Sequence, residues 1–205
     1  MRTKTLPLKV ISIDKLYNGD KITFEVPIYQ RNYAWEKEEI ATLVQDVYDA
    51  FQVKRGFYYI GTLVTFHKGD QVYEVIDGQQ RLTTVNLVLA VMNIPRWNKL
   101  TYRARKKSND TIQSIPNFEV DEKDLGIING YNFALEAINE KIPESEKSAF
   151  ANYFRHQVQL VYYQVPKDID LNHYFEVMNS RGEQLEKHEI IKARLIQNLN
   201  NADKS

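Results

Sequence analysis

The sequence predicts an α+β fold in which a small mixed sheet carries a buried helix. The first observation is a set of β-rich runs at residues 57–66, 71–76 and 157–165. The second is an amphipathic helical pattern from Trp35 to Phe51. The third is the run VNLVLAVM, which is apolar on nearly every side of a helix and is therefore expected to pack on the sheet.

The first half of the chain alternates strands and helices. The first predicted strand covers residues 22–26 and is closed by Pro27. The first predicted helix carries its apolar stripe on Ile40, Leu43, Val44, Val47 and Phe51. The strands at 57–66 and 71–76 are joined by HKGD, in which Gly69 and Asp70 suit a tight hairpin turn. The buried helix follows from Leu82 to Met92, and Ile94 and Pro95 end it.

The second half has a weaker pattern. Residues at about 96–156 are predicted as an inserted, mainly helical region, with one helix near 125–138. After the strand at 157–165, two helices are predicted from apolar faces at Leu171, Tyr174, Phe175 and Met178, and at Ile191, Leu195 and Leu199. We expect one domain over residues 1–205, and the polar tail at 198–205 is consistent with a longer natural protein.

The composition excludes several function classes. Lys plus Arg and Asp plus Glu both number 27, so no overall field attracts nucleic acid or an anionic membrane. Cysteine is absent, which excludes disulfides and thiolate chemistry, and no run of 18 apolar residues occurs. We therefore expect a soluble, cytoplasmic protein without membrane partners. The four histidines lack metal-ligand spacing, and no serine lies in a nucleophile-elbow pattern.

The segment EVIDGQQRLTT, residues 74–84, places a strand end, a glycine turn and a helix start in succession. This geometry directs backbone N–H groups and the positive end of a helix dipole at one point, where an anion can bind. Gly78 would let a phosphate approach the backbone, Arg81 could bind it, and Thr83 and Thr84 add hydroxyl donors. Asp77 could bind Mg²⁺ or a ribose hydroxyl. The alternative, a capped turn in which Asp77 and Arg81 pair with each other, stays open from spacing alone.

Three further polar segments have structural as well as functional interpretations. In PIYQRNYAW, residues 27–35, Gln30 and Arg31 lie among aromatic side chains that could stack on a base, but a proline-led surface turn fits as well. The basic segment RWNKLTYRARKK, residues 96–107, could contact nucleic acid, although a solvated loop is the commoner meaning of such a run. The turn NSRG, residues 179–182, suits a helix C-cap without any ligand.

Taken together, VPIYQRNYAW, LVQDV, YYIGTLV, YEVIDGQQRLTT and YFEVMNSRGEQLEKHEIIKA resemble the DGQQR family, the N-terminal domain of GmrSD-type Type IV restriction proteins. The resemblance covers the chain from about Ile11 to Leu199. It implies a ParB/sulfiredoxin-like fold that binds and hydrolyses a nucleoside triphosphate with Mg²⁺, in a system that restricts phage or modified DNA.

The resemblance also implies functional residues. The catalytic residues would be Asp77, which could also hold Mg²⁺, Gln80 and Arg81. The nucleotide-binding and phosphate-binding residues would be Tyr29, Gln30, Arg31, Gly78, Gln79, Thr84, Asn179, Ser180 and Arg181. We expect Gln30 or Arg31 to face the same cleft as Arg81, with residues 179–182 on its rim and an aromatic ring as one wall.

Many relatives carry a C-terminal HNH-like nuclease domain, and this chain has neither the length nor the histidine arrangement for one. The chain alone is therefore not expected to cleave DNA, and a nuclease domain or subunit is its expected partner. The competing hypothesis is a non-enzymatic DNA-binding or regulatory module that uses the same basic pocket for backbone phosphate.

Overall fold

A six-stranded mixed sheet forms one layer of the structure, a computed structural model that describes residues 8–18, 21–96 and 99–167. The strand order is β1-β6-β3-β4-β2-β5. The strands are β1 (Leu8–Ser12), β2 (Thr23–Glu25), β3 (Tyr58–Gly69), β4 (Val72–Asp77), β5 (Lys99–Thr101) and β6 (Val158–Val165). Antiparallel pairs join β1 to β6 and β3 to β4, and the other neighbours are parallel. The predicted α+β class with a mixed sheet is confirmed, and the ParB/sulfiredoxin-like assignment stays a prediction.

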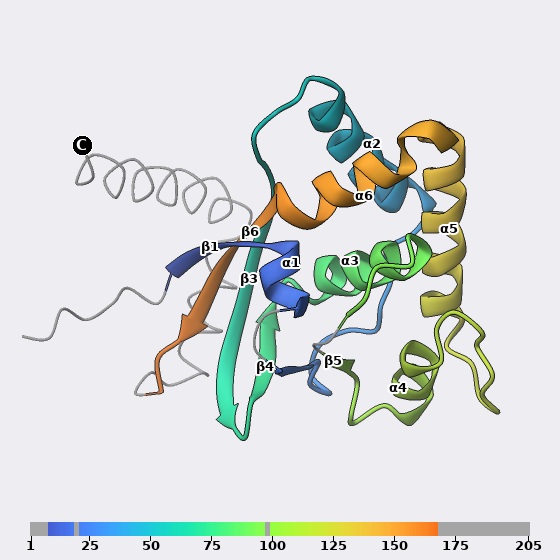
Figure 1. Ribbon diagram of the computed structural model, residues 1–205. Helices are drawn as coiled ribbons and strands as arrows, with labels where there is room; N and C mark the ends of the chain where they lie inside the picture. The colour runs from blue at the N-terminus through green and yellow to red at the C-terminus, as the bar shows by residue number, and fades with distance from the viewer. Residues whose placement is uncertain (1–7, 19–20, 97–98, 168–205) are drawn as a thin grey trace, which may run out of the picture.

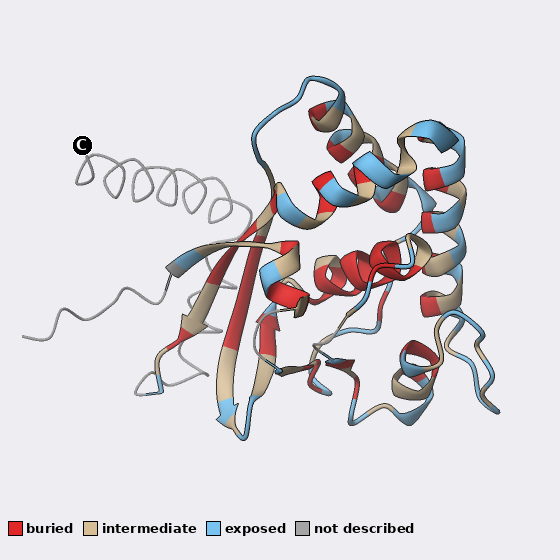
Figure 2. Ribbon diagram, viewed as in Figure 1, coloured by how far each residue is buried: buried red, intermediate tan, exposed pale blue. Residues whose placement is uncertain are grey.

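The described helices lie on one side of the sheet (Figure 1). They are α1 (Ile13–Asn18), α2 (Lys37–Gln52), α3 (Gln79–Val91), α4 (Lys106–Gln113), α5 (Leu125–Lys141) and α6 (Lys147–His156), with a 3₁₀ turn, η1, at Glu144–Glu146. Helix α3 lies between the sheet and α5. Every residue from Leu82 to Ala90 is buried, and Figure 2 shows α3 red over most of its length. The prediction of a buried central helix is confirmed.

The boundaries of two predicted elements shift for local backbone reasons. The hairpin turn consists of Asp70 and Gln71 rather than the predicted Gly69 and Asp70. Asp70 and Gln71 both have a positive φ, 45° and 62° respectively. Two consecutive positive φ angles are typical of the type I′ turn, whose twist matches that of the strands. Helix α3 ends at Val91, before Ile94 and Pro95, because Asn93 adopts φ 55° and the N–H of Ile94 turns back to bond the Leu89 carbonyl.

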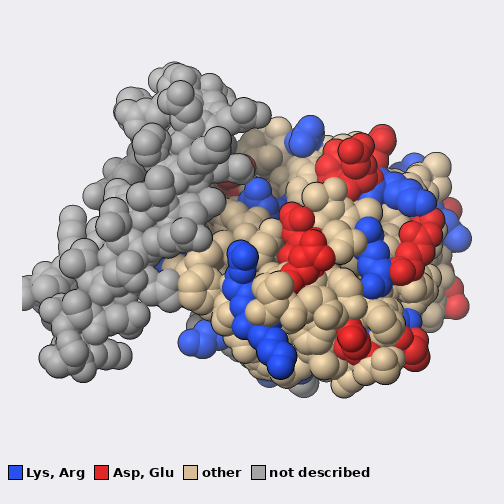
Figure 3. Space-filling model, turned by 90° about the horizontal axis from the view of Figure 1, so that it is seen from above, with Lys and Arg blue, Asp and Glu red and all other residues tan. Residues whose placement is uncertain are grey.

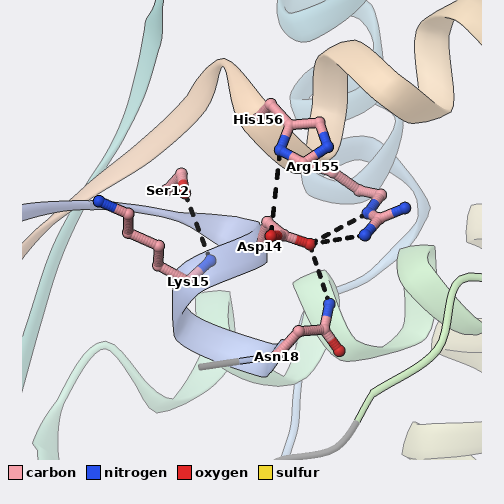
Figure 4. Close-up of polar contacts among 6 residues, drawn as sticks. All are labelled: Ser12, Asp14, Lys15, Asn18, Arg155 and His156. Carbon is pink, nitrogen blue, oxygen red and sulfur yellow. Dashed lines mark hydrogen bonds and ion pairs between the residues drawn. The ribbon is translucent and has the colours of Figure 1, made fainter. Parts of the chain in front are cut away.

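The sequence pattern missed the first strand and helix. Strand β1 pairs with β6, and α1 follows it directly. In the cluster drawn in Figure 4, Asp14 of α1 accepts hydrogen bonds from Arg155 of α6 at 2.7 and 3.2 Å and from Asn18 at 3.1 Å. His156 Nδ1 lies 4.0 Å from the same carboxylate. This cluster fastens the N-terminal elements to the end of α6.

The region at 96–156 contributes to the sheet and to the helical layer. Strand β5 forms one end of the sheet beside β2, and Leu100 and Tyr102 are buried in the core. Helix α5 packs on both α2 and α3. The predicted helical content is present, and whether the region is an insertion relative to relatives stays a prediction. The two helices predicted after residue 167 lie outside the described residues.

Candidate functional site

The segment of residues 27–36 lies beside the N-terminus of α3, and a cavity of about 220 Å³ opens between them. Its described lining residues are Gln30, Arg31, Trp35, Asp77, Gly78, Gln79, Gln80 and Arg81. We call it the phosphate cavity, because the sequence predicts a phosphate site here. The expectation that Gln30 or Arg31 shares a cleft with Arg81 is confirmed, since both line this cavity, and Trp35 is its aromatic lining residue. The predicted rim residues Asn179, Ser180, Arg181 and Gly182 lie outside the described residues.

Position 78 requires glycine because of its backbone conformation and because strand β3 lies close to it. Its φ is 88°, in the left-handed region, and a Cβ atom there would lie 2.6 Å from the Thr62 carbonyl oxygen of β3. A larger residue would therefore strain the turn and push α3 away from the sheet. This reason differs from the predicted one, close approach of a phosphate, and it applies without any ligand.

The start of α3 has the expected anion-binding geometry. The first intrahelical bond runs from the N–H of Leu82 to the carbonyl of Gly78, at 2.9 Å. The N–H groups of Gln79, Gln80 and Arg81 therefore precede the hydrogen-bonded turns of the helix, at the positive end of its dipole. Gln79 and Gln80 both border the cavity.

The side chain of Gln80 fastens the 27–36 segment to α3. Its Oε1 accepts a hydrogen bond from the backbone N–H of Ala34, and its Nε2 donates to the carbonyl of Asn32, both at 2.9 Å. Gln79 Nε2 donates to the carbonyl of Arg31 at 3.1 Å. A catalytic role for Gln80 stays a prediction, and these contacts favour a role in positioning the segment.

The outer half of the segment is held by three other side chains. Gln30 Nε2 donates to the carbonyl of Ile76 at 2.6 Å, next to Asp77. The Tyr29 hydroxyl donates to Glu74 at 2.6 Å. Arg105 donates through Nη2 to the carbonyls of Ile28, at 2.8 Å, and of Gln30. The backbone that presents Arg31 to the cavity is thereby fixed from both sides.

Two residues of the predicted nucleotide-binding set lie away from the cavity walls. Tyr29 extends along β4, where its hydroxyl bonds Glu74. Thr84 is fully buried, and its hydroxyl bonds the Gln80 carbonyl at 3.0 Å and the Tyr33 hydroxyl at 2.8 Å. A ligand in the cavity would not reach Thr84 without opening the core.

The charged groups of the cavity come from three places in the fold. Arg31 and Asp77 are exposed, at the 27–36 segment and at the end of β4. Arg81 is half-buried, and its Nη1 donates to the Thr62 carbonyl at 2.9 Å. The guanidinium lies against Gly61, where a Cβ atom would be 2.6 Å from Cζ of Arg81. Glycine at position 61 thus makes room for this arginine.

A second cavity, of about 630 Å³, adjoins the first and shares Trp35 and Arg81 with it. Its other described lining residues are Glu38, Glu39, Thr42, Leu43, Asp46, Tyr58, Tyr59, Ile60 and Gly61. The Tyr58 hydroxyl donates to Asp46 at 3.2 Å, and burial together with this carboxylate raises the pKa of Tyr58 to about 12. We did not predict this cavity. The only signal in the sequence was the spacing of Glu38, Glu39, Thr42 and Asp46 along one side of α2.

Two of the six basic residues in the segment 96–107, Arg96 and Arg105, are anchored to the fold. Arg96 donates to the backbone and side-chain oxygens of Asn86 at 3.0 and 3.1 Å, and burial lowers the pKa of Arg96. Arg105 holds the 27–36 segment, whereas the other four basic residues are exposed: Lys99, Arg103, Lys106 and Lys107. The solvated interpretation therefore holds for these four residues, and Arg96 and Arg105 depart from it. On the face that carries α2 and α6, Lys and Arg side chains lie interspersed with Asp and Glu (Figure 3).

The described residues contain neither a candidate metal cluster nor a candidate membrane-spanning helix. Across 8–18, 21–96 and 99–167, His, Asp and Glu form no group of three or more that could hold a metal ion. Within the same ranges, no helix combines the length and apolar character needed to cross a bilayer.

Comparison with known proteins agrees with the resemblance seen in the motifs. Residues 13–196 match the family described as GmrSD restriction endonuclease, N-terminal domain. The matched span includes both lining segments of the phosphate cavity and the region at 96–156. No match was found among curated proteins. Because the match covers most of the 205 residues, the chain belongs to the family of GmrSD restriction endonuclease N-terminal domains.

Proposed function

We propose that this chain binds a nucleoside triphosphate in the phosphate cavity and hydrolyses it with Mg²⁺, as the sensor domain of a DNA restriction system that acts against phage. Family membership supports the role in restriction. The observation that carries the nucleotide proposal is the convergence of Arg31, Arg81 and the N-terminus of α3 on one cavity. Two guanidinium groups and a helix N-terminus form a strongly anion-attracting site.

The residues around the cavity have separable functions in this proposal. Arg81 binds a phosphate oxygen while its Nη1 stays hydrogen-bonded to the Thr62 carbonyl. The guanidinium is therefore held in place before the ligand arrives. Arg31 is exposed and adds charge at the mouth. The N–H groups of the first turn of α3 donate hydrogen bonds to the other phosphate oxygens.

Asp77 fits the role of a magnesium ligand. It is an exposed carboxylate at the end of β4, beside the proposed phosphate position. Mg²⁺ is commonly held by one or two carboxylates together with substrate phosphates and water. The ion would neutralise charge that develops on the phosphates during hydrolysis. Asp77 would hold the ion, and the arginines would orient the phosphate chain.

The alternative function is a non-enzymatic module that binds the phosphate backbone of DNA in the same cavity. Its support is the small volume of the phosphate cavity, about 220 Å³, and the exposure of Arg31 at its mouth. In both proposals the nuclease activity belongs to another domain or subunit.

Titration calorimetry and a phosphate-release assay separate the two functions. With Mg²⁺ present, we expect binding and turnover of at least one of ATP, GTP, CTP and UTP. Arg81→Ala should weaken binding about 10- to 150-fold, because a hydrogen bond to a charged group contributes roughly 1.5–3 kcal/mol. Binding of duplex DNA without nucleotide binding or turnover would support the alternative. Binding of neither ligand would contradict both functions.

A further inference from the structure

The second cavity has no function in the phosphate-binding proposal, although the two cavities meet at Trp35 and Arg81. Its volume, about 630 Å³, lies within the usual range of small-molecule sites, whereas 220 Å³ lies below it. The phosphate cavity can therefore hold only part of a nucleotide. A ligand that continues past Trp35 enters the second cavity.

The two cavities differ in charge. The phosphate cavity carries Arg31, Arg81 and the N-terminus of α3 against one carboxylate, Asp77. The second cavity shares Arg81, but α2 lines it with the three carboxylates of Glu38, Glu39 and Asp46. These carboxylates would repel a phosphate chain and accept hydrogen bonds from hydroxyl or amino groups. A ligand with one anionic end and one neutral, donor-bearing end therefore has a single favourable orientation.

Aromatic side chains give the second cavity surfaces for a flat ring. Trp35 stands where the cavities meet, and Tyr58 of β3, whose side chain reaches α2, lines the second cavity. The hydrogen bond from Tyr58 to Asp46 holds one of these rings in position. Stacking of a base on an aromatic side chain contributes roughly 1–3 kcal/mol and tolerates different bases.

We infer that the second cavity binds the nucleoside part of the nucleotide, its sugar and base, while the phosphates lie at Arg31 and Arg81. The inference rests on the proposed nucleotide binding and specifies the ligand class: a nucleoside triphosphate, in preference to bare polyphosphate or a DNA backbone phosphate. Arg81 lines both cavities and therefore contacts the ligand where its phosphates join the nucleoside.

Thr42→Trp tests this inference because it fills the second cavity from an exposed position of α2. Calorimetry would compare whichever of ATP, GTP, CTP and UTP binds the unaltered chain most tightly with inorganic tripolyphosphate. We expect Thr42→Trp to weaken nucleotide binding at least about tenfold, the effect of losing one stacked base. Tripolyphosphate binding should be unchanged. The matched control is Gln52→Trp, at another exposed position of the same helix and outside both cavities.

The outcomes distinguish a wrong subsite from a wrong function. Nucleotide binding that survives Thr42→Trp but is lost in Arg81→Ala would overturn the nucleoside subsite and leave the phosphate site standing. The subsite would also be overturned if Thr42→Trp weakened the binding of nucleotide and of tripolyphosphate equally. The same would follow if the unaltered chain bound nucleotide and tripolyphosphate with equal affinity. If the unaltered chain binds no nucleotide, the proposed function fails and the subsite fails with it.

Discussion

The side-chain amide of Gln80 donates a hydrogen bond of 2.9 Å to the backbone carbonyl of Asn32, 48 residues earlier in the chain. At its other end, the amide accepts from the N–H of Ala34. Through these two bonds the DGQQR motif positions the YQR segment, and both face the same cavity. The second glutamine of the motif thus makes contacts within the protein that would be needed even without a ligand.

Gln80→Ala should lower the free energy of unfolding by about 1–3 kcal/mol, because Gln80 is buried and both of its backbone partners would lose a hydrogen bond. Urea denaturation followed by circular dichroism measures the change. Gln52→Ala is the control, since it removes one exposed bond to Glu146 and should change stability by less than about 0.5 kcal/mol. A Gln80→Ala protein as stable as the control would contradict the positioning role.

Arg105→Ala should weaken nucleotide binding although Arg105 does not line either cavity. Its guanidinium holds the carbonyls of Ile28 and Gln30, and so fixes the backbone that presents Arg31. We expect about a 10-fold loss of affinity, at the lower end of the range for one charged hydrogen bond, with Arg105→Lys restoring part of it.

The control for Arg105 is Arg103→Ala, which removes the same charge from an exposed position two residues away. Nucleotide affinity and its salt dependence should be measured for both variants. Equal losses would show that the segment acts through its net positive charge rather than through the Arg105 contacts.

Gly61→Ala should disturb both stability and ligand binding. Gly61 has φ 110°, and an added Cβ would lie 2.6 Å from Cζ of Arg81, so the guanidinium must leave its place. We expect a loss of more than about 1 kcal/mol in unfolding free energy together with weaker nucleotide binding. Gly56→Ala is the matched control, because nothing lies within 4 Å of its added Cβ. If Gly61→Ala retains full nucleotide affinity, Arg81 does not bind the ligand from its observed position.

Asp77→Asn should spare nucleotide binding but reduce turnover and its dependence on Mg²⁺, since a neutral amide is a weaker ligand for a hard cation. Phosphate release measured over a range of Mg²⁺ concentrations tests this expectation. Asp70→Asn, in the turn between β3 and β4, is the control and should behave like the unaltered chain. Unchanged turnover in Asp77→Asn would remove the aspartate from the metal site.

The Asp14 cluster predicts a pH-dependent contribution to stability. Burial tends to raise the pKa of Asp14, but the hydrogen bonds from Arg155 and Asn18 and the charges of Arg155 and His156 outweigh burial and lower it below the ordinary value of 3.8. The carboxylate therefore stabilises the folded chain fully above pH 3.8, and this stabilisation is lost as the pH falls through the lower folded pKa.

Asp14→Asn should accordingly destabilise the chain at neutral pH, and its difference from the unaltered chain should shrink at acidic pH. Chemical denaturation at several values between pH 7 and about pH 2 measures that difference, which should stay constant down to about pH 4 and shrink below it. Asp110→Asn is the control, because Asp110 pairs with Lys106, whose side chain is 90% exposed, and such surface pairs contribute little. A difference that stays constant across the range would show that Asp14 is not stabilised as a carboxylate.

The sequence alone determined the elements whose patterns are local. The all-round apolar run predicted the burial of α3, and the apolar stripe predicted α2, because each residue's burial follows from the helical repeat within a few turns. The strand-glycine-helix order of the DGQQR segment likewise predicted a cavity at the start of α3. Strand β1 and helix α1 are five and six residues long, too short for a clear period, and they were missed.

Only the tertiary structure decided what the individual site residues contact. Gln80 reaches Asn32 and Ala34, and Arg105 reaches Ile28 and Gln30, across 46 to 77 residues of chain. Gly61 is needed because Arg81 lies against it, and the second cavity forms only where α2 faces β3. Periodicity reports how a segment divides its side chains between core and solvent, but it carries no information about which distant segment packs there. The chemistry of this cleft depends on such long-range pairing, and therefore on the folded chain.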